Sequence, residues 1–299
     1  MKLLTKPTIE AAIVYDTCIG DLTAPDLAKK FTDARDEVLA AFAEYEANAS
    51  ESTLFSFPRC RRGNDHQIVV GGLTKGELVS LYTSHLAGKS ATARKFYDQI
   101  MLLAPSGKCP FCTCAPAETL DHFMSKSIYP AFSVLLSNLT PACFSCNKGK
   151  GFAAMNADEQ VLHPYYEPDL IETSIWLYAE LLETVPASIS FRASPPADWP
   201  HDLAVRLANY FRDFRIAWRF GIEAASEITS QAAYLIEIAS PQDRRIHLER
   251  VARVERRERK NSWKAALFEA LAQSEWFQNE GCLLHSQGRT YPPQRPAAL

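Results

Sequence analysis

The chain has 299 residues, of which 47% are hydrophobic and only 12 are glycine, a composition that predicts one or two compact domains with a proper core. Its 32 Lys and Arg residues against 35 Asp and Glu residues give a net charge of −3, which argues against a general nucleic-acid binder but not against a locally basic cleft. No apolar run has the length of a membrane-spanning helix, and residues 1–7 are too short for a signal peptide, so the sequence predicts a cytoplasmic protein with no membrane partner.

The first third of the sequence predicts helices. Within residues 26–47, apolar residues recur at spacings near three and four, which is typical of an amphipathic helix. Thr74 and Glu77 have the spacing of a capping box, which predicts the start of a further helix. Another helix is predicted over residues 91–103, capped by Ser90. Together the last two helices predict a helical hairpin.

A doubled cysteine pattern follows this hairpin. It consists of two Cys-x-x-Cys pairs separated by a long insert, namely Cys109 with Cys112 and Cys143 with Cys146. Each pair can present two thiolates to one side of a metal ion, and four thiolates suit a tetrahedral structural zinc. Cys114 is an alternative ligand, although the x-x spacing of the second pair favours Cys112. The other cysteines, Cys18, Cys60 and Cys282, are expected to be buried thiols, and disulfides are not expected.

The insert between the cysteine pairs predicts two short strands. Residues 120–122 read Leu-Asp-His, and residues 138–140 read Asn-Leu-Thr, with a polar and aromatic loop between them. A helix is predicted from about Ser145. It carries Asn147, Lys148 and Lys150. Strand, long loop, strand and helix, crossed by two cysteine pairs, resemble the ββα-metal fold of HNH nucleases.

The resemblance to HNH nucleases implies a role for each motif position. Asp121 matches a metal-binding carboxylate, and His122 matches the general base that deprotonates the attacking water. Asn138 matches the middle position, whose side chain braces the loop and orients the histidine. Asn147 matches the helix position that supplies a second metal ligand, where other members have histidine. The chain is therefore similar to an H-N-N version of the motif, with Gly151 where some relatives add a further ligand.

The residue types also suit phosphodiester hydrolysis in their own right. In-line attack by water needs a base for the water and a cation for the developing charge. A neutral histidine titrates near pH 6.5, close to working pH. An oxygen-rich, partly open site favours Mg²⁺ or Mn²⁺ as the catalytic ion, and Lys148 and Lys150 are predicted to contact phosphate.

The segments after the insert predict a second helical region. His163 precedes a proline in an aromatic turn, which favours a structural role over a place in the active site. Residues 171–184 predict a helix, and the proline-rich residues 194–200 predict a soft domain boundary. Residues 201–239 carry apolar residues at helical spacing, with Trp218 among the predicted core residues.

A basic segment follows. Ser240 and the proline after it predict a helix start. Residues 244–264 hold nine Lys or Arg against three Glu, an excess of six. Two functional interpretations are contact with duplex phosphates and docking on an acidic partner. The alternative is a solvated helix face stabilised by ion pairs such as Glu249 with Arg253.

The sequence as a whole predicts a mainly α protein with a small α+β insert, in which a central zinc-braced ββα-metal motif is embedded in a helical scaffold. The expected regions are an N-terminal helical part at 1–104, the nuclease core at 105–170 and a C-terminal helical part at 171–299. Residues 83–100, which lead into the first cysteine pair, resemble those of bacterial HNH proteins from phage-defence and mobile-element settings.

The predicted function is a metal-dependent HNH endonuclease that hydrolyses double-stranded DNA as an effector of anti-phage defence. One alternative is a catalytically silent, zinc-braced module that binds nucleic acid or a partner protein. A second is a nuclease held inactive by a regulatory partner such as an ATPase subunit. The presence of all four motif residues argues against a decayed site.

Overall fold

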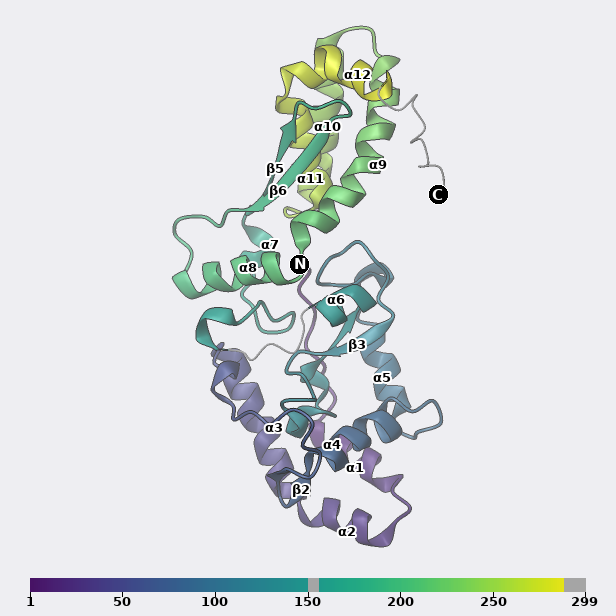
Figure 1. The fold of residues 1–299 in the computed structure, drawn as a ribbon, viewed down its shortest axis with the longest axis vertical. Coiled ribbons are helices and arrows are strands. Elements are labelled where there is room, and N and C mark those ends of the chain that lie inside the picture. Colours follow the sequence, from purple (N-terminus) through teal and green to yellow (C-terminus); the bar gives the residue numbers. More distant parts are fainter. Residues whose placement is uncertain (150–155, 288–299) are drawn as a thin grey trace, which may run out of the picture. The chain divides into compact units, whose positions relative to one another are not determined.

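The chain is mainly helical, with small antiparallel sheets, as the sequence predicts (Figure 1). The computed structural model describes residues 1–149 and 156–287, and the chain divides into unit 1, Met1–Pro168, and unit 2, Asp169–Leu299. The predicted division into three regions remains a prediction. Among the described residues, no helix combines the length and apolar character that crossing a membrane requires.

Helices make up most of the first part of unit 1. They are α1 (Ala11–Gly20), α2 (Pro25–Asp33), α3 (Arg35–Ser50), α4 (Lys75–Ser80) and α5 (Arg94–Met101). The single helix predicted over residues 26–47 is wrong, because the chain forms α2 and α3 with a break at Ala34. Gly71 has a positive φ and packs so closely here that a Cβ on it would lie 2.5 Å from the Ala34 Cβ. The close packing of another segment at the break is a tertiary contact that the helical spacing does not encode.

The helical hairpin ahead of the cysteines is present with altered boundaries. Thr74 and Glu77 form the predicted capping box at the start of α4, which continues into a π-helical turn, Leu81–Leu86. The helix predicted over residues 91–103 begins later, at Arg94, without a cap from Ser90. Asp21 accepts hydrogen bonds from the Thr92 backbone N–H and hydroxyl at 2.7 and 2.6 Å. This contact fixes the turns that connect the π-helical turn to α5.

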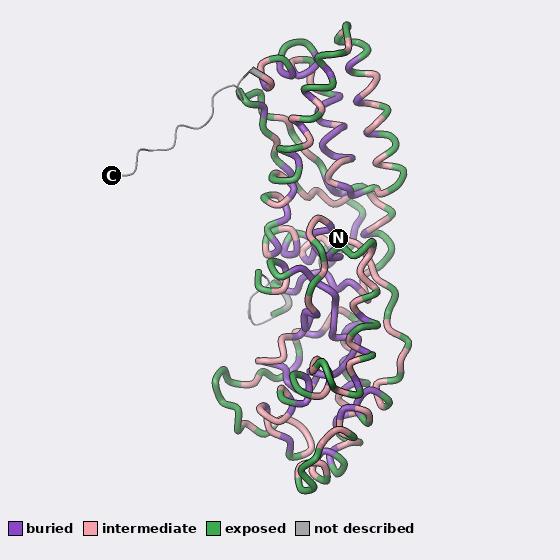
Figure 2. Tube along the Cα trace, turned by 90° about the vertical axis from the view of Figure 1, so that its right-hand side faces the viewer, coloured by how far each residue is buried: buried purple, intermediate pink, exposed green. Residues whose placement is uncertain are grey.

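The insert forms a strand pair and a short helix. Strand β3 (Thr119–His122) pairs antiparallel with β4 (Leu139–Ala142), and α6 (Phe144–Gly149) follows directly. The remaining pair of unit 1 consists of β1 (Ile68–Val70) and β2 (Leu73–Thr74). Nearly every residue from 128 to 143 is buried, so this part of the loop and β4 belong to the core of unit 1. Figure 2 shows the buried stretches of the chain in purple.

Unit 2 combines helices with one strand pair. Its elements are α7 (Leu170–Thr173), β5 (Leu177–Leu182), β6 (Ser188–Ala193), α8 (His201–Asp213), α9 (Ile216–Ile236), α10 (Pro241–Glu258), α11 (Trp263–Gln273) and α12 (Cys282–Gln287). The helix predicted over residues 171–184 is wrong beyond Thr173. Residues 177–182 alternate between buried or half-buried and more exposed positions and pair with β6, a period-two pattern that the helical interpretation overlooked. Residues 194–200 connect β6 to α8 inside unit 2.

Two predicted helices of unit 2 are interrupted. The helix predicted over residues 201–239 breaks at Arg215, whose φ is +52°, and Trp218 on α9 is 54% exposed rather than a core residue. Ser240 caps α10 as predicted. The basic segment does not form one helix, because α10 ends at Glu258 and α11 begins at Trp263, with Asn261 in the turn between them. Its side-chain oxygen accepts the backbone N–H groups of Trp176 and Leu177, at 2.9 and 3.1 Å, so the turn after α10 is tied to β5.

Candidate functional site

The β3–β4 pair and α6 place the predicted motif residues around one part of unit 1. Asp121 lies opposite Thr140 in the strand register, and His122 lies opposite Leu139. The second strand begins one residue after Asn138, which ends a short 3₁₀ turn. The helix begins at Phe144, one residue ahead of the predicted start, and carries Asn147 and Lys148.

The four-cysteine cluster consists of Cys109, Cys112, Cys143 and Cys146. All four are buried, and their Sγ atoms lie within 4.8 Å of one another, a donor set that can bind a zinc ion. Hydrogen bonds among the four thiols lower the pKa of Cys112 and Cys143 and raise the pKa of Cys109 and Cys146, so the four groups titrate as one cluster. Cys114 stays outside the cluster, and its Sγ contacts the Cys112 carbonyl at 3.2 Å.

The other thiols fit the expectation in part. Cys18 and Cys282 are buried, whereas Cys60 is half-buried. The sequence predicted no disulfides, and all of the cysteines are free thiols in the structure.

His122 is held at its Nε2 atom. This nitrogen lies 2.9 Å from the carbonyl oxygen of Ser133, and the side chain is 7% exposed. Because a carbonyl oxygen only accepts hydrogen bonds, Nε2 carries the proton in the neutral ring and Nδ1 carries the lone pair. This hydrogen bond therefore defines the tautomer of the histidine. The ring of Tyr82, from the π-helical turn, packs edge-on against the imidazole with the ring centroids 4.3 Å apart.

Asn138 is fully buried and braces the long loop between the strands. Its Oδ1 accepts from the backbone N–H of Met124 at 2.6 Å and from the Tyr45 hydroxyl at 3.1 Å. Its Nδ2 donates to the carbonyls of Met124 and Phe132, at 3.1 and 3.0 Å. Phe132 directly precedes the residue whose carbonyl holds the histidine. The asparagine thus fixes the loop on which that carbonyl lies.

His163 contributes to the same buried hydrogen-bond network as Asn138. Its Nδ1 accepts from the Tyr165 N–H at 3.1 Å, so Nε2 carries the proton and donates to the Tyr45 hydroxyl at 3.2 Å. The ring also packs on Phe123, with centroids 3.9 Å apart. The structural interpretation of this histidine agrees with these contacts.

Replacing Tyr45 with phenylalanine tests the buried network. The change removes one donor to Asn138 and one acceptor from His163, both buried, so we expect unfolding to become easier by about 1–3 kcal/mol. Chemical denaturation measures the difference. Tyr97→Phe is the matched control, because Tyr97 is only half-buried and is expected to change stability by less than about 0.5 kcal/mol. Equal stability of the two variants would contradict the bracing role of Tyr45.

A pocket of about 480 Å³ joins the predicted metal and base residues. It is lined by Thr119, Leu120, Asp121, His122, Ser125, Lys126, Ser127, Phe144, Asn147 and Lys148. Asp121 is 5% exposed. The Nδ2 of Asn147 donates to Thr119 Oγ1 at 3.0 Å, which leaves its Oδ1 as the oxygen to bind a ligand. Lys150 lies outside the described residues, so its predicted phosphate contact has no structural counterpart here.

Sequence reasoning missed Lys126 and Tyr82. Lys126 lies in the loop after β3, and its Nζ is 4.3 Å from the centroid of the Tyr82 ring. Its position four residues after His122 was the available signal, because both residues flank the same strand end. Tyr82 gives no such signal, since only tertiary packing brings the π-helical turn against His122 and Lys126.

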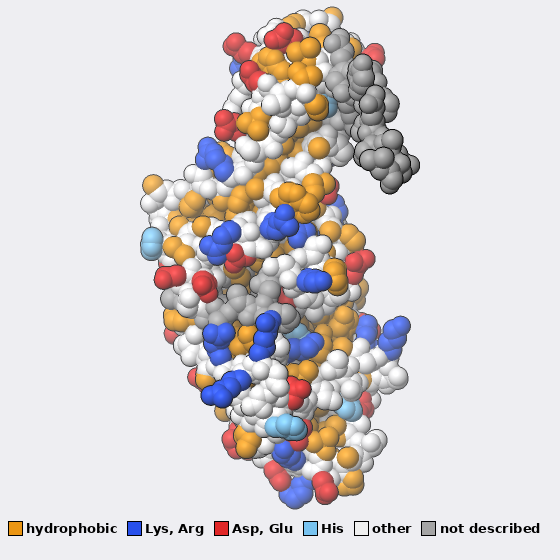
Figure 3. Space-filling view, viewed as in Figure 1, with side chains coloured by type: hydrophobic (Ala, Val, Ile, Leu, Met, Phe, Trp, Pro, Cys, Tyr) orange, Lys and Arg blue, Asp and Glu red, His pale blue; other side chains and the backbone are white. Residues whose placement is uncertain are grey.

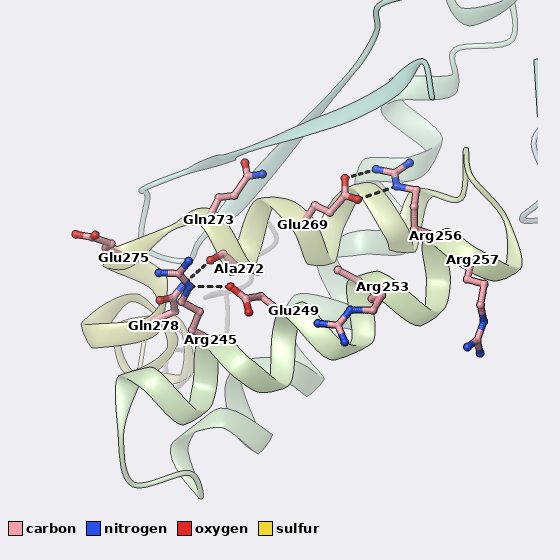
Figure 4. Close-up of a pocket in the computed structure, with 11 residues that line it drawn as sticks. Arg245, Glu249, Arg253, Arg256, Arg257, Glu269, Ala272, Gln273, Glu275 and Gln278 are labelled. Atoms are coloured by element: carbon pink, nitrogen blue, oxygen red, sulfur yellow. Dashed lines mark hydrogen bonds and ion pairs between the residues drawn. The ribbon is translucent and has the colours of Figure 1, made fainter. Parts of the chain in front are cut away.

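The basic segment forms a groove of mixed charge in unit 2. The groove has a volume of about 650 Å³ and lies along α10 and α11 (Figure 4). Arg245 pairs with Glu249 at 2.8 Å, so the predicted pair of Glu249 with Arg253 is wrong, and Arg256 pairs with Glu269 on α11. The face of the chain shown in Figure 3 carries both basic and acidic side chains. The carboxylates neutralise part of the local excess, which favours the solvated, ion-paired interpretation.

The fold and pocket define a class of site in which a strand pair and a helix, braced by four buried thiols, bring a histidine, a carboxylate and an amide to one pocket.

No family model matches the chain, and no solved structure matches it significantly. The chain is 29% identical to protein ea31 of Escherichia phage lambda over 293 residues, which cover 93% of this chain and 99% of ea31. It is 32% identical to Septu protein PtuB of Bacillus thuringiensis over 69 residues, 21% of this chain and only 27% of PtuB.

Proposed function

We propose that the chain is a metal-dependent endonuclease of the HNH type that hydrolyses phosphodiester bonds in DNA. One observation carries the proposal: His122, held at Nε2 by a backbone carbonyl, lines the same pocket as Asp121 and Asn147. A base nitrogen, a carboxylate and an amide oxygen in one pocket are the groups that this hydrolysis requires. The order of strand, strand and helix supports the HNH assignment.

In the proposed reaction, Nδ1 of His122 takes a proton from the water that attacks phosphorus. The Ser133 carbonyl continues to accept from Nε2–H when the ring becomes positively charged, so the hydrogen bond stabilises the charged form. Asn138 acts as a positioning residue. It holds the Phe132 carbonyl and thereby the loop that presents the Ser133 oxygen.

Asp121 and Asn147 would hold the catalytic metal. A carboxylate and an amide oxygen are hard donors, and Mg²⁺ is commonly bound by one or two protein oxygens while it keeps several waters. When bound, Mg²⁺ or Mn²⁺ would stabilise the negative charge that develops on the phosphate and the leaving oxygen. Lys148 is exposed at the same pocket and supplies positive charge for a phosphate.

Cleavage of supercoiled plasmid tests the proposal. Purified protein with Mg²⁺ or Mn²⁺ is expected to convert supercoiled plasmid to open-circular or linear DNA, and excess EDTA is expected to stop the conversion. A protein that has bound zinc and binds DNA but cleaves nothing with either ion would favour the silent binding module. Cleavage that appears only after a partner protein is added would favour the gated nuclease.

We propose a role in anti-phage defence for this nuclease. Similarity to a phage protein and to a Septu protein supports a role in encounters between phage and bacterium. The resemblance of residues 83–100 to HNH proteins of phage defence supports the same role. A regulatory partner such as an ATPase subunit remains part of this proposal, and expression of the chain in phage-challenged bacteria, with and without neighbouring genes, tests it.

A further inference from the structure

Lys126 presents a cation to the candidate pocket from the side of Tyr82. Its side chain is half-buried, and its ammonium lies 4.3 Å from the centroid of the Tyr82 ring. The same aromatic ring packs against His122 with centroids 4.3 Å apart. Tyr82 therefore positions both a base and a cation at one pocket, and neither contact was part of the motif that the sequence revealed.

The ammonium of Lys126 has donors that the protein does not use. Within residues 1–149 and 156–287, it makes no hydrogen bond and no ion pair, although its three N–H groups require acceptors. The face of a tyrosine ring attracts a cation by only about 0.5–2 kcal/mol, which does not replace hydrogen bonds lost on burial. Burial lowers the pKa of Lys126, while the charge of Asp121 opposes that shift. A partly desolvated cation with unused donors in a pocket of about 480 Å³ indicates an anionic ligand.

We propose that Lys126 is a phosphate-binding residue of this site, whose ammonium donates to a nonbridging oxygen of the phosphodiester bound in the pocket. This inference rests on the proposed nuclease function. Lys126 differs from the exposed Lys148, because a half-buried cation interacts more strongly with charge that develops in the transition state.

The test compares Lys126→Met with Lys95→Met. Lys95 is a matched control because its ammonium also lies over an aromatic ring, 5.0 Å from the Phe96 centroid, but on α5 and outside the lining of the pocket. We expect Lys126→Met to lower kcat for plasmid cleavage by about 10²-fold, and Lys126→Arg to recover part of the loss. Thermal unfolding is expected to stay unchanged or to shift upward in Lys126→Met, because methionine removes a partly buried charge. A purely structural lysine would instead lower the unfolding temperature.

Binding without cleavage separates this inference from the proposed function. Anisotropy of a short labelled DNA duplex in EDTA gives the slope of log affinity against log salt concentration. Loss of one phosphate contact is expected to reduce that slope by about 1 in Lys126→Met and to leave it unchanged in Lys95→Met. A reduced slope, with no cleavage by the wild-type protein either alone or with a partner protein, would support Lys126 and overturn the nuclease proposal. A wild-type slope, or no DNA binding by the wild-type protein, would overturn the Lys126 inference.

Discussion

Replacing His122 with alanine is expected to slow metal-dependent plasmid cleavage by about 10²- to 10⁴-fold. The variant loses the nitrogen that accepts the proton of the attacking water, while the oxygen donors of Asp121 and Asn147 stay in the pocket. The rate of conversion of supercoiled plasmid at saturating protein and fixed Mg²⁺ measures the loss. Residual cleavage is expected to remain metal-dependent, because the pocket still offers its oxygen donors.

His66→Ala is the control for this experiment. His66 is exposed in unit 1 and is not among the residues that line the pocket, so its variant is expected to cleave at the wild-type rate. His122→Ala also removes the donor to the buried Ser133 carbonyl, which costs about 1–3 kcal/mol of stability. Zinc content and thermal unfolding of the variant must therefore be measured beside the rate. A folded, zinc-loaded His122→Ala protein that cleaves as fast as His66→Ala would refute the assignment of the base.

The candidate site residues came from the resemblance to HNH nucleases, and their roles remain predictions. Local sequence supports only the elements that carry them, because Asp121 and His122 lie at the end of a predicted strand and Asn147 follows the last cysteine by one residue. The cysteine pairs were predictable for the same reason, since Cys-x-x-Cys spacing itself determines the local geometry. The contact of Asn138 with Tyr45 was not predictable, because α3 and the 3₁₀ turn before β4 are far apart in the sequence and only the folded core brings them together.

The errors in the fold share a physical cause, which is that they concern contacts between segments far apart in the sequence. The capping box at Thr74 and the Ser240 cap were predicted correctly, because a cap depends on residues three positions apart. The helix predicted over residues 171–184 was wrong because β5 depends on pairing with β6 and on backbone hydrogen bonds to Asn261. Trp218 was wrongly placed in the core because helical spacing shows that apolar residues share a face but not what covers that face.

Replacing Cys143 with serine is expected to remove the bound zinc and to disrupt the candidate site. The wild-type protein is expected to contain about 1 zinc ion per chain, and the variant close to none after dialysis, because serine does not supply the thiolate that a four-thiolate site requires. The cluster connects the segment before β3 to the start of α6. Without zinc, the orientation of β3 relative to α6 loses its brace, and unit 1 is expected to unfold at a lower temperature.

Cys114→Ala distinguishes a cluster ligand from a neighbouring thiol. Its Sγ contacts the Cys112 carbonyl and is not part of the cluster, so this variant is expected to keep its zinc and its unfolding temperature. Metal analysis and thermal unfolding of both variants give the comparison. Zinc loss in Cys114→Ala together with zinc retention in Cys143→Ser would show that the ligand set is different. Because zinc content is read without DNA, the result identifies the brace whether or not the pocket cleaves phosphodiesters.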